Sequence, residues 1–172
     1  INPICAVIAL EKLKKLDFYI SSRKQRLDYL SQGLLDIPGL SPPVTRDYVD
    51  RGAYYGYRPF IQKKELNNID ISKFIDIMRS EGMEIRQSGN LPLHLLPLFN
   101  KPVSVIKNFE LPITDKNEKR GYYKEGDLPI SEFFYNNTFS LPTFTFESEE
   151  LIDKYINAFT KVCNHLRRNK LF

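Results

Sequence analysis

Apolar side chains recur at three- and four-residue steps through the first 36 residues, the spacing that places them along one face of an α-helix. Asn2 can cap this helix, and Pro3 suits its first turn. The pattern predicts one long helix, or two in line, that would reach about 50 Å, longer than a small domain needs for its own core. We therefore expect residues 1–37 to connect two bodies. The apolar positions are Ile4, Val7, Ile8, Leu13, Leu16, Ile20, Leu27, Leu30 and Leu34.

A strand is predicted after this helix. Residues 38–43 contain three prolines and a glycine, which end the helix and favour extended backbone. Residues 54–62 are rich in aromatic side chains and predict a strand. If Gly56 makes no bulge, alternation places two tyrosines on one face and three side chains on the other. The first set is Tyr55 and Tyr57, and the second is Tyr54, Arg58 and Phe60.

The following segment predicts a helix and a second strand. Asp70 or Ser72 can cap the helix, and Gly82 can end it. Residues 83–86 then predict a short strand. The apolar stripe of the helix consists of Phe74, Ile75, Met78 and Ile71.

The second half of the chain alternates irregular and regular segments. The prolines in residues 91–99 predict a packed irregular segment, and the polar, sign-balanced residues 104–127 predict a mobile charged loop. Residues 131–137 predict a short helix, residues 138–144 a strand broken by a proline, and residues 147–168 a final amphipathic helix. The sum is an α/β fold in which a small mixed or antiparallel sheet packs with helices, led by the long N-terminal helix.

Composition fits one soluble globular domain. The 172 residues are 42% apolar and 27% charged, and the formal net charge is only +4 with its signs interleaved. The one basic run, Arg167, Arg168 and Lys170, is weak support for a nucleic-acid module, so we expect neither nucleic acid nor membrane as a partner. Charged residues at 11–15 interrupt the apolar start, which argues against a signal peptide or membrane span and favours a cytoplasmic protein.

The cysteines and histidines limit the chemistry that this chain can carry. Cys5 and Cys163 have neither Cys-x-x-Cys spacing nor a histidine that completes a zinc set, so we expect buried free thiols and no metal site. Glycine-rich phosphate loops and the Gly-x-Ser-x-Gly elbow are absent from the sequence. Only His94 and His165 are present, so no complete catalytic set is predicted.

Three residues remain as candidates for a binding site. His94 lies among leucines and prolines, where it is either a structural histidine or a side chain held rigidly at the rim of a cleft. Tyr57 and Arg58 belong either to a core strand or to a surface that contacts sugar hydroxyls or a substrate phosphate.

Six stretches together resemble one family. The opening residues 1–17 are similar to the segment that begins the long helix after the large domain in the DegT/StrS family of pyridoxal-phosphate-dependent sugar aminotransferases. The other five follow in the order and approximate spacing of that family, so the resemblance spans essentially the whole chain. They are residues 54–60, 74–82, 92–99, 128–132 and 140–144.

This resemblance implies that residues 1–172 form the C-terminal small domain of a fold-type-I aminotransferase. In that family the small domain packs beside a large domain that binds pyridoxal phosphate, commonly in a homodimer. The substrates are typically keto-sugars, often linked to a nucleotide, with glutamate or glutamine as amino donor. The Schiff-base lysine of the family belongs to the region preceding Ile1, so we carry over no catalytic residue and expect this chain alone to hold no cofactor. His94, Tyr57 and Arg58 are carried over as walls or substrate contacts.

Two functional hypotheses follow. The first is the C-terminal part of an aminotransferase, which contributes walls of the substrate site and dimer contacts. The second is a non-catalytic binding or interaction protein with the same fold, because the region that would hold the cofactor is missing from this sequence.

Overall fold

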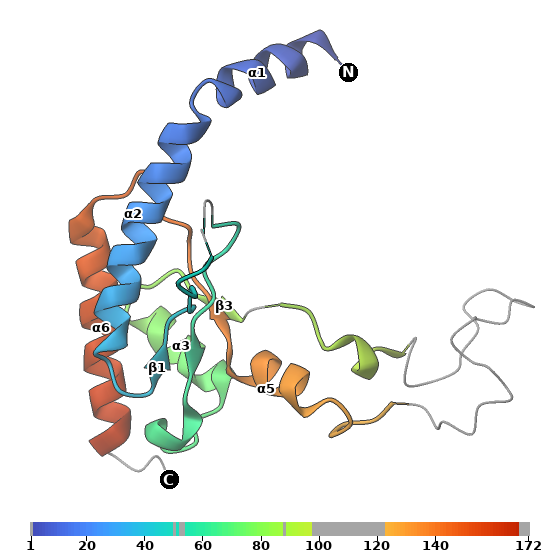
Figure 1. Cartoon of the computed structure of the whole chain (residues 1–172). Coiled ribbons are helices and arrows are strands. Elements are labelled where there is room, and N and C mark those ends of the chain that lie inside the picture. The colour runs from blue at the N-terminus through green and yellow to red at the C-terminus, as the bar shows by residue number, and fades with distance from the viewer. Residues whose placement is uncertain (1, 50, 52–53, 88, 98–122, 169–172) are drawn as a thin grey trace, which may run out of the picture.

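The computed structural model describes residues 2–49, 51, 54–87, 89–97 and 123–168. Two successive helices, α1 (Pro3–Leu13) and α2 (Leu16–Leu35), open the chain, and α1 projects away from the rest of the molecule (Figure 1). The Oδ1 atom of Asn2 accepts a hydrogen bond from the backbone N–H of Ile4 at 3.0 Å, so the predicted cap is confirmed. The sequence pattern left open one long helix or two in line, and the structure has two.

The strands form a small antiparallel sheet. Strand β1 (Leu40–Ser41) pairs with β2 (Phe60–Ile61), and β3 (Arg86–Gln87) pairs with β4 (Phe139–Ser140). Two isolated bridges, Tyr57 to Leu141 and Phe60 to Thr138, join the pairs, and the resulting order is β1-β2-β4-β3. The predicted α/β fold with a small antiparallel sheet is confirmed.

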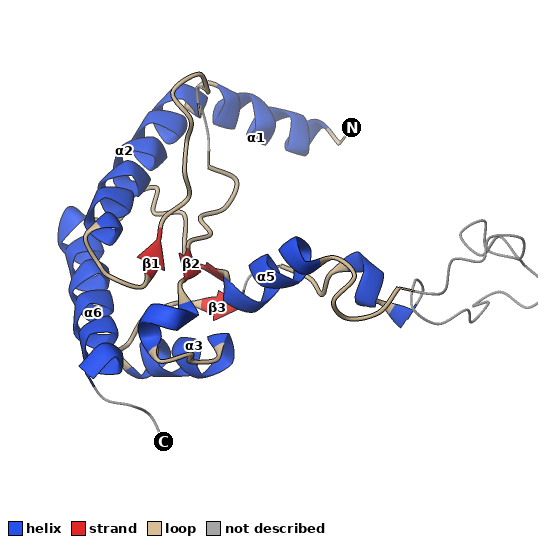
Figure 2. Cartoon of the chain, turned by 60° about the horizontal axis from the view of Figure 1, so that its bottom comes forward, coloured by secondary structure: helices blue, strands red, loops and turns tan. Residues whose placement is uncertain are grey.

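Three further helices pack around the sheet (Figure 2). They are α3 (Ile71–Ser80), α5 (Pro129–Asn137) and α6 (Glu149–Arg168), and short 3-10 turns cover Lys63–Leu66 and Leu93–Leu95. Helix α6 lies alongside α2 in Figure 1. The apolar stripe predicted for α3 is confirmed, because all four of its members are buried. Gly82 follows α3 with φ +86°, the left-handed conformation expected of a glycine at that position.

The core lies between the sheet and these helices. The ring of Phe139 on β4 lies 5.7 Å from Phe74 of α3 and 5.5 Å from Phe159 of α6, measured between centroids. Burying one such side chain stabilises a fold by about 1.5–3 kcal/mol. This aromatic cluster therefore ties the sheet to two helices.

Two expectations were wrong. Tyr54 is buried beside Tyr57 while Tyr55 is 97% exposed, because the backbone bends at Tyr55 and shifts the alternation. The hydroxyl group of Tyr54 donates a hydrogen bond to Oδ1 of Asp28 at 2.8 Å, which holds the ring on the core side. The second wrong expectation concerns Cys5, which is exposed because α1 contains no buried residue. Cys163 is buried as expected, and burial raises its pKa to about 12.

Several predicted segments are only partly tested. Residues 104–122 of the predicted loop lie outside the described residues, as does the end of the segment 91–99. Regular pairing covers only two residues in each predicted strand region, and β3 begins at Arg86, the last residue of the strand predicted at 83–86. No helix in the described part of the chain combines the length and apolarity needed to cross a membrane.

Candidate functional site

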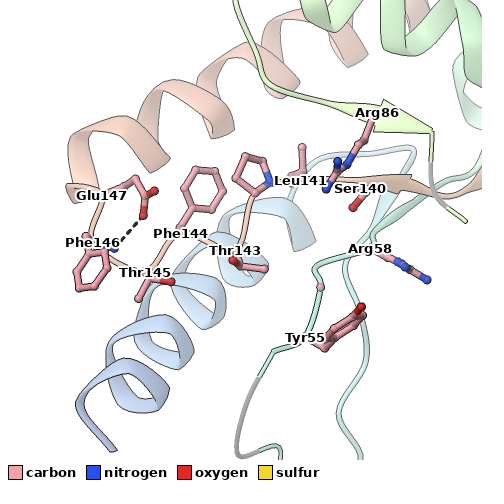
Figure 3. A pocket seen from close by; sticks show the side chains of 12 residues that line it. Tyr55, Arg58, Arg86, Ser140, Leu141, Thr143, Phe144, Thr145, Phe146 and Glu147 are labelled. Carbon is pink, nitrogen blue, oxygen red and sulfur yellow. Dashed lines mark hydrogen bonds between the residues drawn. The ribbon is translucent and has the colours of Figure 1, made fainter. Parts of the chain in front are cut away.

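A pocket of about 520 Å³ opens on the side of the sheet where β4 leads into α6 (Figure 3). Its lining comes from the segment before β2, from β3 and from the connection between β4 and α6. The lining residues are Tyr55, Gly56, Arg58, Arg86 and the continuous segment 140–147.

Side chains of α2 fix the wall formed by residues 143–147. The hydroxyl group of Ser22 donates to the backbone oxygen of Thr145 at 2.7 Å, and the Nε atom of Arg23 donates to Oγ1 of the same residue at 3.0 Å. The Nε atom of Arg26 donates to the backbone oxygen of Glu147 at 2.6 Å. Because these donors come from a helix, the wall has little freedom to move.

This wall contains one residue with strained backbone. Phe144 has φ +30°, a conformation that costs a residue with a side chain about 1–3 kcal/mol. Its ring is 2% exposed and packs edge-on against Tyr155, with 5.0 Å between centroids. The burial of the ring offsets the backbone strain and holds the chain in its turn along the pocket.

Two arginines provide most of the charge in the pocket. Arg58 and Arg86 are both exposed, and neither side chain has a hydrogen bond or ion pair with another described residue. The carboxylate of Glu147 also lines the pocket, and its Oε2 atom accepts a hydrogen bond from the backbone N–H of Phe146 at 2.9 Å. Hydroxyl groups of Ser140 and Thr143 add neutral donors. This set of donors suits an anionic ligand.

The structure separates Tyr57 from its neighbour Arg58. Tyr57 is fully buried, and its hydroxyl group shares a hydrogen bond of 2.7 Å with Oγ of Ser31 in α2. Burial is the main reason that its pKa is raised, so the hydroxyl group stays neutral. Tyr57 therefore faces the core, whereas Arg58 lines the pocket.

His94 lies elsewhere, in the 3-10 turn before the gap in the described chain. It is 4% exposed, and its Nε2 atom is hydrogen-bonded to Oε1 of Glu132 at 2.8 Å. Glu132 also accepts hydrogen bonds of 2.9 and 3.0 Å from the backbone N–H of Gly126. The hydrogen bond from His94 is the largest cause that lowers the pKa of Glu132. His94 does not line the pocket that contains Arg58.

The candidate site thus contains one predicted residue and two that sequence analysis missed. Arg58 lines the pocket, while Tyr57 and His94 do not. Arg86 and Ser140 enter it through strand pairing. Their strands were predicted, but the register that brings them together could not be inferred from residue type.

A second, smaller hollow lies at the junction of α1 and α2. Its volume is about 340 Å³, and apolar and aromatic side chains make up most of its lining. The ring of Phe146 covers one side and packs edge-on against Tyr19, with 5.5 Å between centroids. Helix α1 itself carries five large apolar side chains that are exposed: Ile4, Val7, Ile8, Leu10 and Leu13.

Chemistry that needs a metal or an imine finds no matching residues in the described pocket. The described residues contain no group of three or more histidine, cysteine, aspartate or glutamate side chains that could hold a metal ion. None of the residues that line the larger pocket is a lysine, so its lining supplies no amine for an imine.

Comparisons with known proteins agree on one family and one fold. The sequence profile of the DegT/DnrJ/EryC1/StrS aminotransferase family matches residues 1–122. The chain is 25% identical over 153 residues to the spore coat polysaccharide biosynthesis protein SpsC of Bacillus subtilis, a match that covers 89% of this chain and 34% of that protein. The chain thus spans about a third of the length of this curated relative.

Two solved structures illustrate the shared fold. An aminotransferase from Psychrobacter cryohalolentis superposes with a TM-score of 0.73 at 15% identity, covering 95% of this chain and 39% of that one. The E. coli GDP-4-keto-6-deoxy-D-mannose-3-dehydratase with bound hydrated PLP gives a TM-score of 0.61 at 21% identity, covering 88% and 33%. At these identities the likeness shows the fold alone.

Proposed function

Because the chain belongs to the DegT/DnrJ/EryC1/StrS aminotransferase family, we propose that it is the C-terminal small domain of a pyridoxal-phosphate-dependent aminotransferase that acts on a keto-sugar. The observation that carries this proposal is the family match over residues 1–122. The fold similarity supports it, since about a third of each solved aminotransferase or dehydratase superposes on nearly the whole chain.

The proposed domain comprises residues 1–172, with residues 1–37 as the connection to a large domain. Helix α1 supports this assignment because it has no buried residue and five large apolar side chains exposed by half or more. Such a surface is unfavourable in water and needs a covering partner. We propose that a large cofactor-binding domain covers it and that a second copy of the enzyme completes a homodimer.

In this proposal the cofactor lysine comes from the large domain. When bound, pyridoxal phosphate supplies an electron sink for the carbon whose amino group is transferred. The residues of this chain would supply a wall that excludes water and fixes the orientation of the sugar. The fastening of residues 143–147 to α2 supports that role, because an orienting wall has to be rigid.

Among the three predicted binding residues, we propose different roles. Arg58 would contact an anionic group of the substrate, since it is exposed in the pocket and has no acidic partner among the described residues. Tyr57 would support the strand from the core side through its hydrogen bond to Ser31. His94 would contribute a second wall, held in place by Glu132.

The experiment is a transamination assay on this chain joined to, or mixed with, its pyridoxal-phosphate-binding large domain. A nucleotide-linked keto-sugar and L-glutamate are supplied, and the formation of 2-oxoglutarate is followed. We expect Arg58→Gln to raise KM about tenfold with little change in kcat, because it removes a binding contact of about 1.4 kcal/mol. Arg168→Gln, an exposed arginine at the end of α6, is the matched control.

The products decide between neighbouring activities. Loss of water from the sugar without amino transfer would assign the complete protein to the dehydratase type instead. Absence of both reactions in the assembled protein would overturn the enzymatic proposal and favour an interaction protein with the same fold. Borohydride reduction of this chain alone with pyridoxal phosphate is expected to leave no stoichiometric adduct, and a single labelled lysine would contradict the assignment of the lysine to the large domain.

A further inference from the structure

The contact between His94 and Glu132 determines which nitrogen of the imidazole carries a hydrogen. The Nε2 atom of His94 and the Oε1 atom of Glu132 lie 2.8 Å apart, so one hydrogen is shared between them. An ionised carboxylate can only accept hydrogen bonds, whereas a neutral imidazole has one N–H donor and one acceptor nitrogen. The protonation state of Glu132 therefore decides the tautomer of His94.

The structure holds Glu132 in its ionised form. The backbone N–H of Gly126 donates to both carboxylate oxygens, at 2.9 Å to Oε1 and at 3.0 Å to Oε2. The hydrogen bond with His94 is the first cause that lowers the pKa of Glu132, and the backbone of Leu128 acts in the same direction as that of Gly126. Burial opposes these bonds but does not outweigh them. At neutral pH the carboxylate is thus an acceptor, and the hydrogen belongs to Nε2.

The other ionisable groups near this contact do not compete for the imidazole. The ring of Tyr123 packs edge-on against His94, with 6.3 Å between centroids. Asp127 is bonded within its own turn, because its Oδ2 atom accepts a hydrogen bond from the backbone N–H of Lys124 at 2.9 Å. Glu125 and the side chain of Lys124 are exposed. Among the residues that the structure describes, a single carboxylate is therefore bonded to this buried ring.

We propose that Glu132 is a positioning residue that fixes His94 as its Nε2–H tautomer and leaves Nδ1 as the nitrogen that takes up or releases a proton. The bond from Nε2 persists when the ring is protonated, because both nitrogens of an imidazolium are donors. Nδ1 then changes from an acceptor to a donor while the ring keeps its orientation. In the role of a substrate-site wall, which rests on the proposed function, neutral His94 would accept a hydrogen bond from a ligand hydroxyl group rather than donate one to an anion.

The test is NMR spectroscopy of the imidazole nitrogens in the full 172-residue chain, labelled with ¹⁵N, at neutral pH. The chain has two histidines, and His165→Gln, at an exposed position, assigns their signals. We expect the Nε2–H tautomer of His94 to exceed the other by about tenfold or more, because its partner is charged. In the urea-unfolded chain, which provides the reference, we expect His94 to populate both tautomers.

Substitutions of Glu132 test whether this residue sets the tautomer. Glu132→Gln can present either an amide oxygen or an NH₂ group to Nε2, so we expect both tautomers of His94 to appear. Glu132→Ala removes the acceptor and should have the same effect. Glu125→Gln removes the same charge at an exposed position and should leave the spectrum of His94 unchanged. The signals of His165 should be the same in all three variants.

Three outcomes would overturn the proposal: comparable amounts of both tautomers in the native chain, a native Nε2 without hydrogen, or an unchanged single tautomer in both Glu132 variants. Thermal melts establish that each variant is folded, and the alanine variant decides the outcome where the glutamine variant is unstable. The spectrum of the native chain tests the tautomer even where both variants unfold.

This experiment fails separately from the proposed function. A fixed Nε2–H tautomer, lost in the Glu132 variants, would leave the inference intact even where the assembled protein transfers no amino group. Transamination by an assembled protein in which His94 has mixed tautomers would remove the positioning role of Glu132 but leave the enzyme.

Discussion

At the scale of single residues, the carboxylate of Glu132 joins its own helix to the turn just before it and to a turn that lies 38 residues earlier in the chain. It belongs to α5, accepts a hydrogen bond from the backbone of Gly126, and is bonded to His94 in the turn before the gap in the described chain. His94 is the first cause of its lowered pKa, and the backbone N–H of Gly126 acts in the same direction. These bonds favour the ionised carboxylate in the folded protein.

This arrangement predicts a specific acid sensitivity. Because the folded pKa of Glu132 lies below its ordinary value of 4.5, its stabilising contribution is complete above pH 4.5 and is lost as the pH falls through the lowered pKa. We expect the melting temperature of the native chain to fall more steeply between pH 5 and pH 3 than that of Glu132→Gln. Thermal melts monitored by circular dichroism across this range measure the difference. Glu65→Gln, at an exposed glutamate, should keep the native slope, and an equally steep slope for Glu132→Gln would contradict the prediction.

At the same scale, the sequence indicated candidate binding residues, but not which residues meet in the pocket. Arg58 could be singled out because it lies in an aromatic strand pattern, and it lines the pocket. Arg86 and Ser140 join it through pairings between segments that are more than 50 residues apart, and no local pattern determines such a register. The bend at Tyr55 was likewise not predicted, and it places Tyr54 rather than Tyr55 in the core.

At the scale of elements, α2 and α6 pack closely at Gly33. A Cβ atom added at Gly33 would lie 2.8 Å from Cγ1 of Ile156 in α6, closer than carbon atoms approach in a packed core. In an exposed helix, alanine would be favoured over glycine by about 1 kcal/mol. Here we expect Gly33→Ala to lower the free energy of unfolding by about 1–3 kcal/mol, because overpacking outweighs helix propensity.

Urea unfolding measures this effect, and a double-mutant cycle assigns it to the helix contact. In an Ile156→Ala background, Gly33→Ala should cost little or even stabilise the fold, since the clashing atoms are gone. Gln32→Ala, at the exposed neighbour in α2, should change stability by less than about 0.5 kcal/mol. A stabilised Gly33→Ala in the native background would show that α6 yields easily and that the two helices are not tightly packed.

The elements themselves were predictable to different degrees. The stripes of α3 and α6 and the cap at Asn2 were predicted correctly, because helical periodicity extends over many residues and caps are local. The strands predicted at residues 54–62 and 138–144 contain β2 and β4 but are too long, and the strand predicted at residues 83–86 shares only Arg86 with β3. A strand this short owes its existence to its partners and to the aromatic core beneath it, and neither is encoded in its own sequence.

At the scale of the whole molecule, α1 separates the protein into a packed body and an unpacked arm. The body contains every buried residue of the described chain, whereas α1 contributes none. The apolar residues of the first 36 positions were predicted to form one helical stripe. In the structure, the members of this stripe in α1 are exposed, and its members in the second half of α2 are buried. A helical pattern predicts that a face is covered, but not whether the covering surface belongs to the same body.

The two cysteines give a direct measure of whether a partner covers α1. Cys5 is exposed on the arm, while Cys163 is fully buried and its pKa is raised to about 12. Thiol reagents should therefore label the isolated chain rapidly at Cys5, and at Cys163 only after unfolding. When the chain is joined to or mixed with the proposed large domain, we expect the labelling rate of Cys5 to fall at least tenfold. Cys163 serves as the internal control, since its rate should change only if the body itself opens. An unchanged rate at Cys5 in the assembled protein would mean that α1 remains in solvent, and the large domain would have to meet this chain through another surface.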